Sequence, residues 1–126
     1  MSDNKEYVSQ TLENGAIHIS EEVISSIAAM SAMDVDGVYG LGTTAGADLG
    51  KLKKKAATKD VRVVISENDE ISIDCYIIVL YGYSVVEVAK AVQETVSATV
   101  ASTTGRVVRD VNVSIGGICL PKDGKK

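Results

Sequence analysis

The chain has 126 residues, enough for one domain with its own core and too few for two domains of ordinary size. Apolar residues make up 45% of it, which excludes disorder throughout, and a net charge of −4 disfavours a general nucleic-acid binder. Two cysteines exclude a disulfide framework, and no secretory signal or membrane-length apolar run is present, so we expect a soluble protein of a reducing cytoplasm.

The N-terminal part of the chain predicts a short strand followed by a helix. Residues 1–14 are polar and are expected to form a flexible segment. The sequence GAIHIS, residues 15–20, alternates in polarity and predicts a strand. Ser20 suits a helix N-cap, and the acids Glu21 and Glu22 suit the first turn of that helix. Apolar residues spaced by three and four predict that the helix runs to about Met33.

A glycine- and lysine-rich stretch, at about residues 40–60, is expected to be a flexible loop within the domain. The simplest interpretation of its positive charge is a solvated loop. The alternative is a contact with an anionic surface, either lipid headgroups or nucleic acid. The lysines that would make this contact are Lys51, Lys53, Lys54, Lys55 and Lys59.

The C-terminal half predicts a hairpin, a long helix and a last strand. The runs VRVVIS and ISIDCYIIVLY flank the polar loop ENDE, as in a β-hairpin. Ser84 and Glu87 form a capping-box pattern at the start of a helix of about twenty residues, which Gly105 should end. The alternating run VVRDVNVSI predicts a strand that Gly116 and Gly117 break.

This order of elements indicates an α+β fold, a two-layer sandwich in which two main helices pack on one face of a mixed sheet. We expect a single domain over residues 15–118 and a flexible tail over residues 119–126. On the long strand, the residues from Ile71 to Tyr81 that share odd parity should face the helices.

The opposite face of the predicted sheet has an unusual composition. Tyr76, Ile78 and Leu80 are apolar there, and Val64 and Val108 are expected beside them on neighbouring strands. A solvent-facing antiparallel sheet is normally polar on that side. We therefore predict a contact surface for self-association or for a partner, formed by these five residues.

No pattern in the chain indicates catalysis, a metal or a cofactor. Ser84 comes two residues after Gly82, as in a nucleophile elbow, but the second glycine of that pattern is missing, and His18 is the only histidine available as a base. Asp34 and Asp36 begin like a calcium loop but lack the later oxygen ligands. Cys75 shares parity with core residues and is expected to be an inert buried thiol.

Four segments resemble the alkaline shock protein 23 family of Gram-positive bacteria. They are GAIHISEEVISSIA, GVYGL, IDCYIIVLYGYSVVEVAKAVQETV and VNVSIGGI, and they cover most of residues 15–118. The resemblance implies a cytoplasmic, non-enzymatic protein of the cell-envelope stress response, without cofactors or catalytic residues. It also implies self-association, and attachment to the inner face of the membrane through a related membrane-anchored protein.

Two function hypotheses follow from these observations. The first is a non-catalytic interaction or scaffold protein of the cell envelope, which assembles with itself and is held near the membrane by a partner without inserting into it. The alternative is a small RNA-binding protein that uses the lysines of residues 51–59, since the preceding glycines are similar to the Gly-x-x-Gly loop of the KH module. Against this alternative, the chain is acidic and lacks aromatic residues between the lysines for base stacking.

Overall fold

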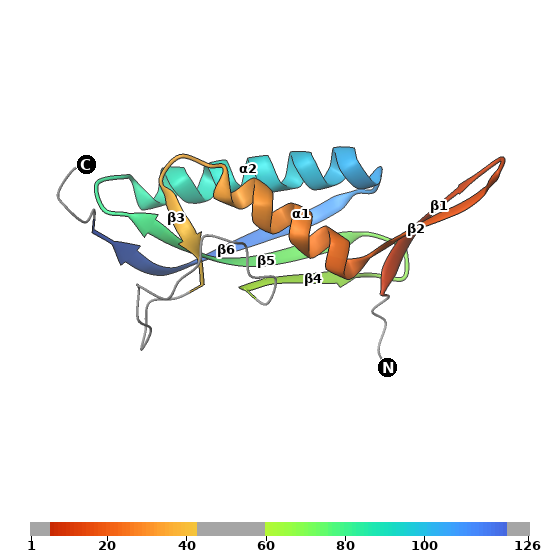
Figure 1. Ribbon diagram of the computed structural model, residues 1–126, viewed down its shortest axis with the longest axis horizontal. Coiled ribbons are helices and arrows are strands. Elements are labelled where there is room, and N and C mark those ends of the chain that lie inside the picture. Colours follow the sequence, from red (N-terminus) through yellow and green to blue (C-terminus); the bar gives the residue numbers. More distant parts are fainter. Residues whose placement is uncertain (1–5, 43–59, 121–126) are drawn as a thin grey trace.

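The computed structural model describes residues 6–42 and 60–120, which form a two-layer α+β domain with a projecting hairpin. Its elements in chain order are β1 (Tyr7–Leu12), β2 (Gly15–Ser20), α1 (Glu21–Met33), β3 (Val38–Leu41), β4 (Val61–Ile65), β5 (Ile71–Leu80), α2 (Val85–Thr104) and β6 (Val108–Cys119). Figure 1 shows α1 and α2 together over the four-stranded sheet, while the β1–β2 hairpin extends beyond one end of both layers. The predicted two-layer α+β architecture is confirmed.

Strand β5 is the centre of the sheet. Strand β6 runs parallel to it along its whole length, from Ile71 to Leu80. Its other edge is shared by two antiparallel strands, because β4 pairs with the first half of β5 and β3 pairs with the second half. The sheet is therefore mixed, as predicted, and the β4–β5 hairpin has the predicted strands on either side of its polar loop.

The core lies between the sheet and the two helices and is built almost entirely from aliphatic side chains. Alternate residues of β5 are fully buried on the helix side of the sheet, and every fourth residue of α2 packs onto them. The β5 residues are Ile71, Ile73, Cys75, Ile77 and Val79, and the α2 residues are Val88, Val92, Val96 and Val100. Valine and threonine are weak helix formers, so α2 depends on this packing for its stability.

Both helices begin and end at the predicted residues. The Ser20 Oγ atom accepts a hydrogen bond of 3.2 Å from the backbone N–H of Val23, at the start of α1. The Ser84 Oγ atom accepts one of 3.3 Å from the N–H of Glu87, at the start of α2. Gly105 ends α2 with a φ of 74°, and its N–H donates to the Ala101 carbonyl.

Strand β1 lies where the sequence predicts a flexible segment, and that prediction is wrong for residues 7–12. The strand pairs antiparallel with β2 along its whole length, and Val8 is fully buried at its base. Its remaining residues are mainly polar, because most of the hairpin extends past the core. The polar composition therefore reflects the position of the strand and not a lack of structure.

The glycine pair near the end of β6 does not break the strand as predicted. Strand β6 continues to Cys119, and its register with β5 shifts so that Gly117 lies opposite Ile78 while Ile115 lies opposite Ile77. Gly116 is thus the extra residue of a β-bulge, a common place for glycine within a strand. The predicted flexible loop, beyond residue 42, and most of the predicted tail lie outside the described residues.

Candidate interaction surfaces

The sheet face that points away from the helices is less apolar than predicted. Tyr76 is 47% exposed there, and Val64 and Leu80 are half-buried, but Ile78 has no exposed surface at all. Ile78 therefore cannot contact a partner directly in this conformation. Of the predicted contact residues on this face, Tyr76 is the one that presents a large apolar surface to solvent.

Val108 lies on the helix side of the sheet, so its predicted place on the open face is wrong. It pairs with Ile71 and packs against the core. The register shifts after this pair, so that Asp110 lies opposite Ser72. The shift places one extra residue in β6, so Val108, which precedes it, faces the opposite side of the sheet from the one that alternation predicts. Alternation of residue types along the sequence cannot reveal such a bulge.

The part of the open face near β4 is polar and internally paired. The Asn112 side-chain amide donates a 2.9 Å hydrogen bond to the Asp74 carboxylate from the neighbouring strand. A hollow of about 210 Å³ beside them is lined by Asp60, Arg62, Asp74 and Tyr76. Its carboxylates and its guanidinium have opposite charges, which suits a solvated sheet face better than an apolar contact.

A second apolar surface lies at one end of the molecule, and we call it the end patch. It consists of Tyr81, Tyr83, Val86, Ile118 and Leu120, which are between 43% and 66% exposed. These residues come from the turn before α2, the first turn of α2 and the end of β6. The Tyr81 N–H donates a 2.9 Å hydrogen bond to the Cys119 carbonyl and so holds the turn against the end of β6.

The α1–β3 turn supports the end patch from inside. Gly37 has a φ of 96°, and a Cβ atom there would lie 2.8 Å from the Tyr83 ring and 2.7 Å from Val88. The Gly37 carbonyl also accepts a 2.8 Å hydrogen bond from the Leu80 N–H. Because Gly37 lets the backbone approach so closely, Tyr83 packs on the turn with one side and faces solvent with the other.

The end patch does not follow from strand parity, which predicts Tyr81 on the core face of the long strand. That prediction is wrong, because β5 ends at Leu80 and Tyr81 belongs to the following turn. One signal in the sequence does indicate the patch. Val86 lies off the apolar stripe that begins with Val85 and Val88, so a helix that packs through that stripe must expose it.

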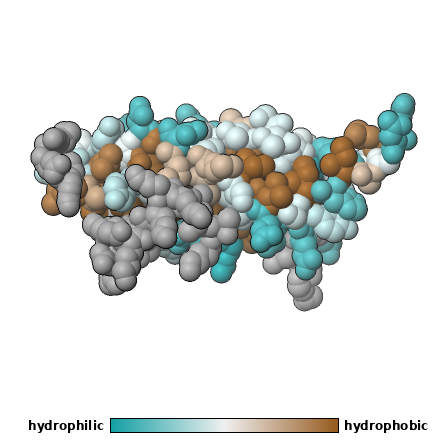
Figure 2. Space-filling model, viewed as in Figure 1, coloured by the Kyte–Doolittle hydropathy of each residue, from teal (hydrophilic) through white to brown (hydrophobic). Residues whose placement is uncertain are grey.

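A third apolar surface follows the β1–β2 hairpin, and we call it the hairpin strip. Leu12 is 55% exposed and Ile17 is 48% exposed. The register of the hairpin places them on the same face as the buried Val8 and its partner Ile19. The strip is therefore an extension of the core face beyond the body of the domain. Figure 2 shows hydrophobic surface both on this hairpin and at the opposite end of the molecule.

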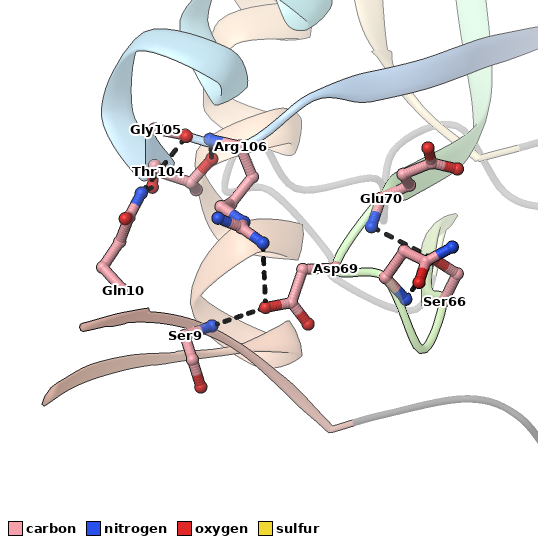
Figure 3. A network of polar contacts seen from close by, with 9 residues as sticks. Ser9, Gln10, Ser66, Asp69, Glu70, Thr104, Gly105 and Arg106 are labelled. Atoms are coloured by element: carbon pink, nitrogen blue, oxygen red, sulfur yellow. Dashed lines mark hydrogen bonds and ion pairs between the residues drawn. The ribbon is translucent and has the colours of Figure 1, made fainter.

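A polar network fastens the hairpin to the body of the domain, as Figure 3 shows. The carboxylate of Asp69, in the β4–β5 turn, accepts 3.2 Å hydrogen bonds from the Ser9 N–H and from Arg106 Nη2. The Gln10 side-chain amide donates to the carbonyls of Thr104 and Gly105 at the end of α2. Three distant parts of the chain thus meet at the base of the hairpin.

The side chains that the sequence offers as a nucleophile or a base, Ser84, His18 and Cys75, make structural contacts or are buried. The Ser84 hydroxyl caps α2, and His18 stacks on Tyr7 with ring centroids 4.4 Å apart on the hairpin. Burial, with a smaller contribution from Asp74, raises the pKa of the Cys75 thiol to about 11, so this thiol is protonated at neutral pH. Within residues 6–42 and 60–120, no group of three or more His, Cys, Asp and Glu side chains could hold a metal ion.

Two of the predicted properties concern membranes and anionic surfaces. In the described part of the chain, neither helix combines the length and the apolar character needed to cross a membrane. The five lysines predicted to contact an anionic surface, and with them the predicted RNA contact, lie outside the described residues. They are Lys51, Lys53, Lys54, Lys55 and Lys59.

Comparison with known proteins gives a family match for most of the chain. Residues 9–120 match the model of the alkaline shock protein 23 family, which is described as having a cell envelope-related function. The chain is 38% identical to the protein YloU of Bacillus subtilis over 107 residues, which cover 82% of this chain and 88% of YloU. It is 35% identical to YqhY of the same organism, over 82% of this chain and 77% of YqhY. Spy1614 of Streptococcus pyogenes is 32% identical, with 84% of this chain and 89% of that protein covered.

Among solved structures, the chain is similar to the MamM CTD in its copper form. The identity is 20%, the TM-score is 0.47, and the match covers 83% of this chain and 90% of that one.

Proposed function

Because the chain belongs to the alkaline shock protein 23 family, whose function is related to the cell envelope, we propose that it is a non-catalytic interaction protein of envelope homeostasis. It associates with itself or with a related chain, and a membrane-held partner keeps it near the inner face of the membrane. The resemblance of its four sequence segments to this family is confirmed at the level of the family.

The end patch is the observation that carries this proposal. Five large apolar side chains gathered at one end of a chain of this size favour a surface that is covered during function. Two of the five are tyrosines, and tyrosine is enriched at protein interfaces because it combines a large apolar ring with a polar tip. The predicted sheet surface is a weaker candidate, because Ile78 is buried and polar pairs occupy the neighbouring part of that face.

The surroundings of the reactive groups favour binding over chemistry. The Ser84 hydroxyl is committed to the cap of α2, and the Cys75 thiol is buried and protonated at neutral pH. The chain's single histidine, His18, lies on the hairpin, at the opposite end of the molecule from the start of α2 (Figure 1). An interaction protein needs no activated nucleophile, whereas an enzyme that uses Ser84 or Cys75 would.

The proposal is tested by replacing the gene with variants and challenging the cells with envelope stress. The pair Val86→Glu and Leu120→Glu is expected to abolish stress tolerance, because it places charge in the end patch. Ser84→Ala is the matched control from the same turn and should keep tolerance at normal protein levels, with about 1 kcal/mol of stability lost with the cap. If Ser84→Ala failed at normal levels while the patch variant succeeded, the proposed function would be wrong.

A further inference from the structure

We infer that the end patch binds a basic segment of another protein, in which apolar side chains stand beside arginine or lysine. This inference rests on the proposed function, and it names the chemistry of the partner that the end patch takes. Acidic side chains lie beside the apolar part of the patch, and the described part of the chain does not neutralise them. A partner that covers the patch must therefore supply positive charge as well as apolar surface.

Three exposed acidic side chains lie beside the end patch, and we call them the acidic rim. Asp34 is the C-cap of α1, and Asp36 follows it in the α1–β3 turn. This turn touches the patch, because an added Cβ atom at Gly37 would lie 2.8 Å from the Tyr83 ring. Glu87 lies in the first turn of α2, the turn that contributes the valine of the patch. Figure 1 shows the α1–β3 turn and the start of α2 at the same end of the molecule.

The end of α1 adds to this negative charge. The C-terminus of a helix carries a partial negative charge from its last carbonyl groups, so that a cation is stabilising there. The last turn of α1 contains no basic residue, and Asp34 and Asp36 follow it instead. The positive end of α2 is already met by Glu87 and by the Ser84 hydroxyl. A cation from a partner is therefore favourable at the end of α1.

The bases of the described residues do not neutralise the acidic rim. Residues 6–42 contain no lysine or arginine. In the rest of the described chain, Arg106 and Arg109 form ion pairs with acids of the β4–β5 turn, and Arg62 lines the hollow on the open sheet face. Lys90 remains, in the second turn of α2. Three acids against one lysine leave an excess of negative charge beside the patch.

The acidic rim distinguishes between kinds of partner. Nucleic acids and anionic lipid headgroups carry negative charge and would be repelled. A second copy of this chain can cover the apolar side chains of the patch, and so it competes for them, but its described bases are few and three of the four lie elsewhere. A basic segment with apolar side chains matches both parts of the surface, and such complementarity gives specificity and rapid association.

The inference is tested with labelled peptides and the full-length protein. The probe is an amphipathic peptide of leucine and lysine, with the leucines at helical spacing so that they form one face. One control peptide replaces each lysine by glutamate, and a second replaces each leucine by serine. Fluorescence anisotropy should show that the leucine–lysine peptide binds and that each control peptide binds at least about tenfold more weakly. Binding should also weaken as the salt concentration rises, because exposed charges are screened.

Charge reversal in the protein locates the binding site. Asp34→Lys and Asp36→Lys together should weaken binding of the leucine–lysine peptide by about tenfold. Glu67→Lys with Glu94→Lys is the matched control, because it changes the net charge equally at exposed residues away from the end patch. This control should bind nearly as the wild type does. Lysine at the end of α1 suits the helix dipole, so the first pair should be at least as stable as the wild type, which urea denaturation checks.

Three results would overturn the inference while the proposed function survives. Equal loss of binding in both charge-reversed variants would mean that the peptide binds the acidic body at large. Equal binding of the leucine–glutamate peptide would mean that the patch recognises apolar surface without regard to charge. No binding of the leucine–lysine peptide would mean that the patch takes a partner of different chemistry.

Stress tolerance in cells separates this inference from the proposed function. The pair Val86→Glu and Leu120→Glu tests whether the patch is needed at all, and the pair Asp34→Lys and Asp36→Lys tests whether the acidic rim is needed. Both pairs should lose tolerance at normal protein levels. If the first pair loses tolerance while the second keeps it, the proposed function stands and the inference is wrong. If both pairs keep full tolerance, both proposals are contradicted.

Discussion

Gly37 is the residue at which the α1–β3 turn meets the end patch. Its φ of 96° is unfavourable for a side chain, and an added Cβ would lie 2.7 Å from Val88 and 2.8 Å from the Tyr83 ring. We expect Gly37→Ala to lower the free energy of unfolding by about 2–4 kcal/mol, because backbone strain and a steric clash add. Urea denaturation followed by circular dichroism measures this change.

Substitutions at two other glycines separate the effect of backbone strain from that of the steric clash. Gly82 has a φ of 106° but nothing within 4 Å of an added Cβ, so Gly82→Ala should cost about 1 kcal/mol through strain alone. Gly40 has neither a positive φ nor a close neighbour, and Gly40→Ala should be nearly neutral. Equal losses for Gly37→Ala and Gly82→Ala would show that Tyr83 and Val88 move aside without cost.

Cys75 is a buried core residue whose raised pKa makes the free energy of unfolding depend on pH above pH 9. Burial, and to a lesser extent Asp74, raises its pKa from 9.0 to about 11. The unfolded thiol ionises from about pH 9 while the folded one stays protonated. The stabilising contribution is therefore complete below pH 9 and is lost as the pH rises towards 11. Two pKa units correspond to about 3 kcal/mol in the free energy of unfolding.

Urea unfolding at pH 8, 9, 10 and 11 measures this loss, and Cys75→Ala should show less of it. The alanine variant starts from a lower stability because it leaves a small cavity, so the slope against pH is the quantity to compare. Cys119→Ala is the matched control and should keep the wild-type slope. If Cys75→Ala has the same slope as the wild type, other groups cause the alkaline loss.

The β1–β2 hairpin is the element whose stability depends most on a few polar contacts. Two-stranded hairpins are marginally stable alone, and only the base of this one reaches the core. We expect Asp69→Ala to reduce amide-exchange protection in β1 and β2 by about tenfold to a hundredfold, because Ser9 and Arg106 both lose their acceptor. Hydrogen exchange followed by mass spectrometry resolves this region from the rest of the domain.

Asp69→Asn is the matched control, because Asp69 has a φ of 63° and asparagine tolerates that conformation. It keeps an oxygen that can accept from the Ser9 N–H but loses the charge that pairs with Arg106. Protection in the hairpin should therefore fall less than in Asp69→Ala. A uniform loss of protection over both helices would instead mean that Asp69 stabilises the whole domain.

The elements that the sequence predicts are those fixed by nearby residues. Ser20, Ser84 and Gly105 set the ends of the helices through contacts within one turn, and alternation sets the strands of the core. Strand β1 could not be predicted in this way, since Gln10 binds carbonyl groups that lie more than ninety residues away. Long-range contacts of this kind leave no local pattern.

The interaction surfaces, too, can be predicted only where a local sequence pattern determines them. The alternation of β5 predicts Tyr76 correctly on the open face, but it cannot predict that Ile78 is buried there. A bulge in β6 reverses parity and moves Val108 to the core. The end patch draws on three segments, and the Tyr81 N–H bond to Cys119 that joins two of them appears only in the folded chain.

At the scale of the whole molecule, apolar surface is exposed at both ends of the long axis, on the hairpin and in the end patch (Figure 1). Residues 1–50 carry eight acids and one lysine, whereas the remaining residues carry nine acids and twelve bases. This division in sequence is not a division between the ends, because Glu13 lies at the hairpin tip while Asp34 and Asp36 lie in the turn that supports the end patch. Apolar surface that is exposed in the single chain favours association of folded chains, because a second molecule can cover it.

Association of folded chains should therefore raise the apparent melting temperature as the protein concentration rises. Binding to the folded state alone adds about 1.4 kcal/mol of stability for each tenfold increase above the dissociation constant, equivalent to roughly 3–8 °C for a domain of this size. Differential scanning calorimetry from 5 μM to 500 μM measures the shift. Val86→Glu should melt at one temperature throughout, since the folded variant has no docking surface, and a shift equal to that of the wild type would place the association on another face.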